Sequence, residues 1–485
     1  MRDDFKNLFK DGLTQFQNGK FLKSESIFLY LLKYEPKNFT LYTYLIPSLI
    51  NQNKLKDAKK YSEELYQLSS HFKETSLIYL GIISQKLQKV KESVDYFHQS
   101  LKINPKNYQS LLNLGVAYHK LNNNWKAIQY TKESIKINKH NSVAYQNIAS
   151  YLEDENQIEE AIEYLQYALS INKNDYNSIH ALSLLQLLKL DYKSGLNNYE
   201  KRFLSSQQKL KYSQFDKLSL NSKIKGKKIL VWHEQGLGDT IQFSRLADML
   251  SELGGIITFE VQAPLENFLK KQFKFEVSSD VQNKQFDYQI PLLSLLKYFN
   301  IDENNIPKLK KTFNCDKDKF LFWKNLIPLK NDKINIGLSV SGNKNHKKEY
   351  RRCIPLEKFN KFTDQSRIFL IQKEISLEDK KIVDQNNEIF FLGENENWND
   401  FTDTSAIVEN MDVIISIDTS LIHLSGSMNK KSYLLLSNPP DWRWGHRENK
   451  IKWYDNVKIL RQNSPRNWVS LIDSLRHLLN QVDDQ

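Results

Sequence analysis

A period of about 34 residues runs through the first half of the chain. Small residues recur at this spacing in two places of the unit, and an aromatic residue recurs in a third. The small residues are Gly81, Gly115 and Ala149 in one place and Ser93, Ala127 and Ala161 in the other, and the aromatic residues are Tyr96, Tyr130 and Tyr164. Small residues at two fixed places let two antiparallel helices approach closely. Because each helical pair leaves an apolar face that only a neighbouring pair can cover, the pattern predicts a stack of helix pairs.

The period and the two small positions resemble the tetratricopeptide repeat. We expect about six units, at 5–38, 39–73, 74–107, 108–141, 142–175 and 176–209. The second unit is irregular, because Pro47 lies inside its first helix and one extra residue precedes the next unit. The sixth is degenerate and is expected to cap the stack. A concave face rich in Tyr, Asn and Gln suits a peptide or a protein partner; the alternative is that the array only holds the second half of the chain.

The bulk composition limits the function classes. The formal charge is +12, from 69 Lys and Arg against 57 Asp and Glu, and the basic residues are spread along the chain beside many Asn. This distribution favours a solvated surface over a nucleic-acid interface, and it is compatible with anionic substrates. The two cysteines form neither a disulfide framework nor a metal motif. With no apolar leader and no run of roughly 18 apolar residues, we expect a cytoplasmic protein without a membrane span.

The periodicity changes after a linker near 219–226. Short apolar runs now alternate with helical patterns, which predicts parallel sheets covered by helices. In the first series the expected strands are 229–232, 256–261 and 287–290, and the expected helices are 240–253, 264–272 and 291–299. In the second series the expected strands are 334–340, 367–371, 389–392, 412–417 and 432–436, and the expected helices are 356–362, 376–385, 399–408, 420–428 and 468–479.

Two doubly wound units in tandem leave a cleft between the carboxyl ends of their strands, which is the GT-B architecture of many glycosyltransferases. Four strings in this half strengthen that interpretation. They are Glu234-Gln235-Gly236-Leu237-Gly238-Asp239-Thr240-Ile241-Gln242-Phe243, the stretch 337–356 with Gly342-Asn343, His346 and Arg352-Cys353-Ile354-Pro355-Leu356, the run Asp418-Thr419-Ser420-Leu421-Ile422-His423-Leu424-Ser425-Gly426, and Pro440-Asp441-Trp442-Arg443-Trp444 with Trp453-Tyr454 and Arg461-Gln462.

Over roughly residues 180–480 these strings resemble the bacterial heptosyltransferase group, glycosyltransferase family 9, and most closely its branch with tetratricopeptide repeats in front. The resemblance implies an α plus α/β chain. Its parts are a tetratricopeptide α-solenoid at 1–210, an acceptor-side Rossmann-like domain at 222–327 and a nucleotide-sugar-side Rossmann-like domain at 328–480. It also implies an inverting, metal-independent transferase that uses a nucleotide sugar as co-substrate and no other cofactor.

Asp239 is the expected catalytic residue. The family places its catalytic base at this Asp, where it takes the proton of the acceptor hydroxyl. The structural alternative is an N-cap carboxylate that satisfies the first turn of a helix. Gly236 and Gly238 then let the main chain approach a substrate, or form a plain tight turn, and Gln242 is assigned to the acceptor side with them.

The donor-binding residues are expected in the second series. Asp418, Thr419 and Ser420 end a strand and open a helix, where free N–H groups suit a diphosphate. His423, one turn further, either donates a hydrogen bond to a phosphate or sugar oxygen of the nucleotide sugar or is a satisfied core histidine. Arg352, with Lys347, aligns with a phosphate-binding lysine of the family, and a solvated charged loop is its alternative. Gln372 is expected near the nucleoside, and no metal site is expected.

The sequence therefore predicts a glycosyltransferase whose repeats recruit a protein or glycan acceptor or a protein partner. One rival is a non-catalytic interaction protein that retains the transferase fold. A second rival is a polypeptide O-linked N-acetylglucosaminyltransferase, which shares the layout but whose own motifs are not found. Trp442, Arg443 and Trp444 either stack on a sugar or base or belong to an aromatic core.

Overall fold

The computed structural model describes residues 2–68, 70–205, 210–328, 333–344, 346, 348–447 and 453–480. The chain forms two compact units, 1–178 and 179–485. The predicted domain limits at 210, 222 and 327–328 stay predictions. Among the described residues, every helix is too short or too polar to cross a lipid bilayer.

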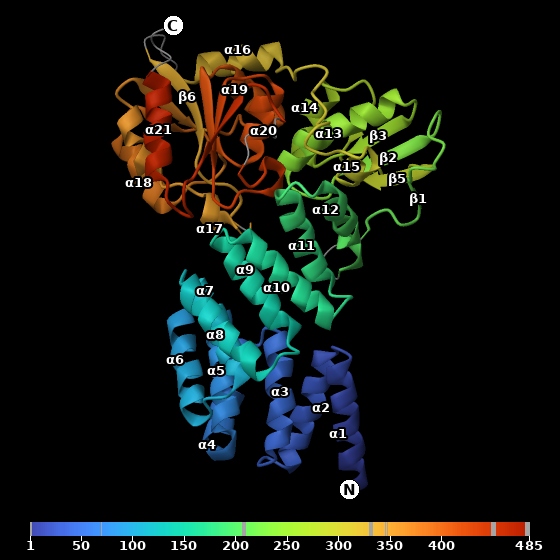
Figure 1. Ribbon diagram of the computed structural model, residues 1–485, viewed down its shortest axis with the longest axis vertical. Coiled ribbons are helices and arrows are strands. Elements are labelled where there is room, and N and C mark those ends of the chain that lie inside the picture. The colour runs from blue at the N-terminus through green and yellow to red at the C-terminus, as the bar shows by residue number, and fades with distance from the viewer. Residues whose placement is uncertain are drawn as a thin grey trace. The chain divides into compact units, whose positions relative to one another are not determined.

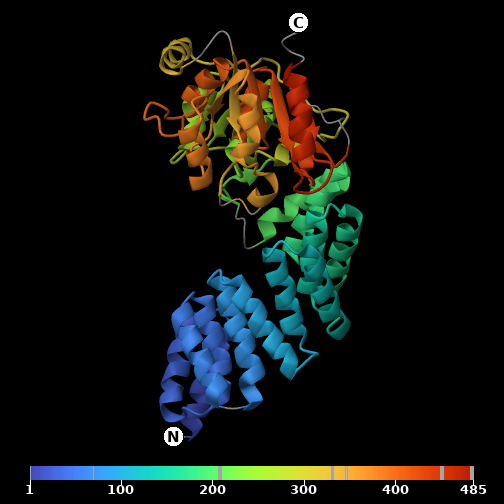
Figure 2. The same ribbon diagram turned by 90° about the vertical axis from the view of Figure 1, so that its left-hand side faces the viewer.

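The first unit consists of helices that pack in chain order against their neighbours (Figures 1 and 2). Its helical pairs are α1 (Arg2–Gln17) with α2 (Phe21–Tyr34), α3 (Phe39–Asn51) with α4 (Leu55–Leu68), α5 (Lys73–Lys86) with α6 (Val90–Ile103), α7 (Tyr108–Lys120) with α8 (Asn124–Ile137), and α9 (Ser142–Asp154) with α10 (Ile158–Ile171). A short 3-10 helix, η1 (Ser70–Phe72), lies between α4 and α5. The first five repeat units were thus predicted within a few residues.

The period is visible in the backbone at the turn inside each pair. One residue in each turn has a positive φ of 57–70°. These residues are Gly19, Asn53, Gln88, Asn122 and Asn156, and Leu190 continues the series beyond the first unit. They are evenly spaced at the period of the sequence, except that one extra residue separates Asn53 from Gln88, as expected for the irregular second unit. Asn and Gly tolerate this left-handed conformation, which explains why they dominate the turns.

The recurring small residues lie where the two helices of a pair touch. A Cβ added at Gly81 would lie 2.5 Å from the ring of Phe97, and one at Gly115 would meet Thr131. The groove beside these glycines is therefore filled by the residue that follows the recurring tyrosine. The recurring tyrosines themselves are half-buried.

The second unit begins inside a sixth helical pair, α11 (Tyr176–Leu188) and α12 (Tyr192–Tyr199), followed by the 3-10 helix η2 (Glu200–Leu204). A parallel sheet follows, in the order β1-β5-β2-β3-β4. Its strands are β1 (Asp216–Lys217), β2 (Lys228–Trp232), β3 (Ile256–Glu260), β4 (Glu276–Ser278) and β5 (Tyr288–Pro291), and its helices are α13 (Leu237–Glu252), α14 (Ala263–Lys270) and α15 (Ser294–Tyr298).

After α16 (Lys317–Leu326), a second parallel sheet has the order β11-β10-β9-β6-β7-β8. Its strands are β6 (Ile334–Ser339), β7 (Ser366–Leu370), β8 (Ile389–Phe391), β9 (Val413–Ile417), β10 (Ser432–Leu436) and β11 (Val457–Arg461). Its helices are α17 (Glu349–Arg352), η3 (Leu356–Phe362), α18 (Leu377–Gln385), α19 (Phe401–Glu409), α20 (Ser420–Ser427), η4 (Trp442–Trp444) and α21 (Val469–Asn480). The strand order reverses between β6 and β9, and such a reversal is where doubly wound sheets bind ligands.

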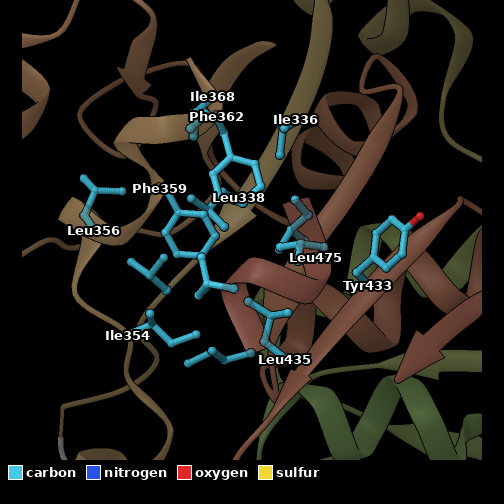
Figure 3. Packing of buried hydrophobic residues seen from close by; sticks show 14 of the residues in the cluster. Ile336, Leu338, Ile354, Leu356, Phe359, Phe362, Ile368, Tyr433, Leu435 and Leu475 are labelled. Atoms are coloured by element: carbon cyan, nitrogen blue, oxygen red, sulfur yellow. The ribbon is translucent and has the colours of Figure 1, made fainter. Parts of the chain in front are cut away.

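The hydrophobic core of the part of the chain that forms the second sheet lies between that sheet and the helices η3 and α21. Phe359 and Phe362 of η3 pack beside Ile336 and Leu338 of β6, and Leu475 of α21 joins them (Figure 3). The side chains that point to this face alternate along the central strand, as the period of two requires. This packing fixes the strand ends from which the candidate site is built.

Candidate functional site

The first part of the site is the start of α13. Gly236 precedes the helix, and its main-chain N–H donates to Asp239 Oδ2 at 2.9 Å. Asp239 is thus the third residue of α13 and not the N-cap that the structural alternative predicted, although its carboxylate does satisfy the N–H of the N-cap Gly236. Its side chain is nearly buried. This local role is compatible with a catalytic one, because only one carboxylate oxygen is used.

The start of α13 lies against the start of α20. A Cβ added at Gly238 would lie 2.8 Å from His423 Cδ2 and 3.3 Å from Ser420 Cα. Glycine is thus the residue that lets the two helices approach, and it joins two motifs that lie far apart in the printed sequence. These motifs were expected on opposite sides of one site, and the structure brings them together.

The second oxygen of Asp239 is held by Arg443. Asp239 Oδ1 lies 2.7 Å from Arg443 Nη2. The same guanidinium donates through Nε to Asp441 at 2.8 Å and through Nη1 to Gln242 Oε1 at 3.0 Å. Burial alone would lower the pKa of Arg443, but the three nearby carboxylates of Asp239, Asp441 and Asp418 raise it well above its ordinary value. Arg443 is therefore a permanent cation. From the sequence it was named only as part of a loop that stacks on a sugar or base or belongs to an aromatic core, and its ionic contact with Asp239 was not predicted.

Arg352 lies at the point where the second sheet reverses its strand order. It follows β6, and its Nη1 donates to the main-chain oxygen of Asp418 after β9 at 2.6 Å. Its Nε donates to Glu349 Oε2, also at 2.6 Å. The guanidinium is fixed by these bonds and lies at the start of α20, so the alternative of a solvated charged loop does not describe it.

The first turn of α20 has no side-chain cap. Thr419 occupies the capping position, but its hydroxyl is bonded to Ser416 Oγ at 3.0 Å and not to the helix. Asp418, Thr419 and Ser420 are half-buried. A first turn whose N–H groups lack a side-chain acceptor, together with the helix dipole, favours an anion.

His423 is almost completely buried and is tied to several partners. Its Nε2 lies 3.5 Å from Asp418 Oδ1, its Nδ1 lies 3.2 Å from the Tyr454 hydroxyl, and its ring stacks on Trp444 at 5.5 Å between centroids. Burial lowers the pKa of His423, although Asp418 acts in the opposite direction. Burial would raise the pKa of Asp418, but His423 and Arg443 outweigh it and hold that pKa well below its ordinary range. The histidine fits the core alternative as well as the site.

The other predicted residues are placed as follows. Gln372 ties the ends of β6 and β7, since its Oε1 accepts from the Val340 N–H at 2.9 Å and its Nε2 donates to Ser341 Oγ. Gln242 is fully buried and bonded to Arg443. Lys347 lies outside the described residues. Trp442 and Trp444 are buried, as in the aromatic-core interpretation, and Trp442 stacks on Phe243 with the ring planes 5° apart.

The equivalent point of the first sheet, between β2 and β5, is filled by the chain itself. Arg202 of η2 donates to both oxygens of Glu234, at 2.6 and 2.8 Å, and to Ser294 Oγ at 2.9 Å. Glu234 also accepts from the Leu293 N–H. The motif residue Glu234 thus anchors the last helical segment, a role that the sequence did not indicate.

A cavity of about 480 Å³ lies elsewhere in the second unit. It is lined by Lys271, Asp316, Asp318, Lys319, Phe322, Asn397, Asn399 and Thr402. None of the predicted site residues lines it. Among the described residues, no three His, Cys, Asp or Glu side chains gather in an arrangement that could hold a metal ion.

Comparisons with known proteins concern the helical repeats. Two tetratricopeptide repeat models match, over residues 96–129 and 142–175. Similar solved structures include TTC0263, a tetratricopeptide protein of Thermus thermophilus, at 14% identity with a TM-score of 0.36, covering 38% of this chain and 99% of that one. PilF of Pseudomonas aeruginosa has 14% identity and a TM-score of 0.36, covering 44% and 96%. A search of curated proteins finds no match. The first part of the chain thus carries tetratricopeptide repeats, a module of protein–protein interaction, followed by a part with parallel sheets.

Proposed function

We propose that the chain is an inverting, metal-independent glycosyltransferase with a GT-B arrangement of two Rossmann-like lobes. It transfers a sugar from a nucleotide sugar to a hydroxyl, and the repeats bring a protein acceptor or partner. The observation that carries the proposal is the contact between the starts of α13 and α20, marked by Gly238 against Ser420 and His423. Two positive helix ends with a carboxylate and two guanidinium groups beside them suit a reaction that generates a diphosphate.

In the proposed reaction the donor diphosphate lies at the first turn of α20 beside Arg352. The acceptor oxygen attacks the anomeric carbon on the face opposite the diphosphate. The bond from that carbon to the phosphate oxygen breaks, and its electron pair leaves with the nucleoside diphosphate. The acceptor proton passes to the carboxylate of Asp239. Arg352 and the helix N–H groups offset the charge that develops on the leaving group.

A ligand screen tests donor binding first. The melting temperature is measured with ADP-, GDP-, UDP-, CMP- and dTDP-linked sugars, because a ligand that binds only the folded state raises it. The variant Arg352→Met should weaken the binding of the responding nucleotide sugar roughly tenfold to a hundredfold, since a charge-assisted hydrogen bond contributes about 1.5–3 kcal/mol. Arg476→Met, at an exposed position on α21, is the matched control and should bind like the wild type.

Turnover of the responding donor is then measured as its hydrolysis, in which water takes the place of the acceptor. Asp239→Asn keeps the size of the side chain and should abolish turnover while the donor still binds. Equal turnover in the wild type and Asp239→Asn would remove Asp239 from the base role. No binding of any nucleotide sugar by the wild type would favour the rival, a non-catalytic interaction protein.

A further inference from the structure

Arg443 is held at the centre of the site by groups from both sheet-bearing halves. Its side chain is 9% exposed, and its three nitrogen positions contact Asp239 Oδ1, Asp441 Oδ1 and Gln242 Oε1 at 2.7, 2.8 and 3.0 Å. Asp239 and Gln242 come from α13, whereas Arg443 lies in η4 of the second half. The guanidinium therefore links the proposed base to the proposed donor side.

The carboxylates around Arg443 outnumber the cations. Asp239, Asp441 and Asp418 all act on its charge. Arg352 is the other guanidinium of the site, and it is itself paired with Glu349. Asp239 and Asp441 both contact the Arg443 guanidinium directly, so each of these two carboxylates is only partly neutralised by it. An incoming anion with several oxygens can replace one of them without leaving the guanidinium unpaired.

Two buried donors beside Arg443 have no acceptor among the described residues. They are Nε2 of Gln242 and Nε1 of Trp444. Gln242 is bonded to Arg443 through its oxygen, and Trp444 follows Arg443 in η4 and stacks on His423. A buried donor without an acceptor is destabilising, and ligand oxygens are one of the groups that satisfy it. In the described part of the chain, these two donors thus have no acceptor, and pyrophosphate oxygens are acceptors that could satisfy them.

We propose that Arg443 is a ligand of the donor pyrophosphate that also controls the base. Without donor, Arg443 neutralises Asp239 and occupies the oxygen that does not cap α13. When a pyrophosphate reaches the start of α20, Arg443 bonds its oxygens and releases Asp239, which then has a free oxygen to accept the acceptor proton. This inference rests on the proposed function, and it makes Asp239 competent only when the donor is present.

The test is a double-mutant cycle on diphosphate affinity. Binding of inorganic pyrophosphate and of ADP, GDP, UDP, CDP and dTDP is measured by calorimetry for the wild type, Asp239→Asn, Arg443→Met and the double variant. Asp239→Asn should bind the responding diphosphate at least roughly fivefold tighter, because the competing carboxylate is gone. Arg443→Met should bind it more than roughly tenfold weaker. In the Arg443→Met background, Asp239→Asn should have no further effect.

The outcomes separate the two proposals. If the wild type binds none of these diphosphates, the proposed function fails and this inference fails with it. If the wild type binds one and Asp239→Asn binds it no tighter, only the inference on Arg443 is overturned. The same holds if Asp239→Asn tightens binding equally with and without Arg443, because the carboxylate then acts by direct repulsion. If Arg443→Met does not fold, Arg443→Gln takes its place, because it also removes the cation that the cycle tests.

Discussion

The buried ion pair between Arg202 and Glu234 allows a quantitative prediction of the stability of the second unit. Their side chains are 1% and 3% exposed, and the guanidinium donates to both carboxylate oxygens. Replacing one partner of a buried pair leaves the other charge without a counterion, which destabilises a protein by about 3–5 kcal/mol. Arg202→Met should therefore destabilise the second unit by about that amount, which corresponds to a fall of roughly 10 °C in its melting temperature.

The assay is urea unfolding followed by tryptophan fluorescence. All the tryptophans except Trp125 lie in the second unit, so the signal reports on that unit. The matched control is Lys308→Met, which breaks a pair whose side chains are 76% and 63% exposed and should change the stability by at most about 1 kcal/mol.

A double replacement tests the reason for the loss. Arg202→Met with Glu234→Met removes both charges and should regain part of the stability that Arg202→Met alone loses, because no charge of the pair stays buried without its partner. The reasoning is refuted if Arg202→Met shifts the unfolding midpoint no more than Lys308→Met does.

Three further predictions concern close contacts and pH. Gly238→Ala should destabilise the second unit by about 1–3 kcal/mol in the same urea assay, because the new Cβ would overlap His423, whereas Gly236→Ala should have a small effect at its exposed position. The pKa of His423 is lowered in the folded state, so below about pH 6.5 the unfolded state binds a proton that the folded state does not, and the stability of the wild type falls as the pH drops. The difference in stability between the wild type and His423→Gln should therefore shrink between pH 7.5 and 5.5. A difference that stays constant over this range would contradict the prediction. Gly81→Val should melt the first unit at a lower temperature, measured by circular dichroism, because Phe97 fills the space that its side chain needs.

The helical pairs were predictable because their period is local. A turn residue in the left-handed conformation recurs once in every repeat. The same helix boundary is therefore marked again in each copy of the repeat. The buried strands were predictable for a similar reason, and β10 was expected at the residues where it is found. The strands β1 and β4 were missed because they are short and contain only one buried residue between them, so they give no apolar run. The edge strand β11 was missed because its side chains are mostly half-buried and give no apolar run.

The site was predictable only where one segment carries the signal. The start of α20 was predicted at the residue where it is found, whereas α13 begins at Leu237, three residues before its predicted start, so that Gly238 and Asp239 lie in its first turn. The pairing of Asp239 with Arg443 joins residues from the two different sheet-bearing halves, and no local pattern in a single sequence reports such a contact. The aromatic neighbours of Arg443 left a stacking role and a packing role for its loop equally open. Glu234, which stands first in one of the four strings, was likewise assigned no role, because its partner Arg202 lies in the last helical segment.

The two sheets differ in what fills the point where their strand order reverses, and this difference decides where a ligand fits. In the first sheet, Arg202 and Glu234 form a buried bidentate pair, and a ligand would have to break this pair to enter. In the second sheet, Arg352 is bonded to one carboxylate and to the main-chain oxygen of Asp418, and the first turn of α20 has no side-chain cap. A phosphate oxygen is a stronger acceptor for a guanidinium than a neutral carbonyl oxygen, so an anion gains more at the second sheet than it displaces. The physical asymmetry therefore supports assigning the proposed donor to the second sheet and leaves the first sheet to hold the last helical segment in place.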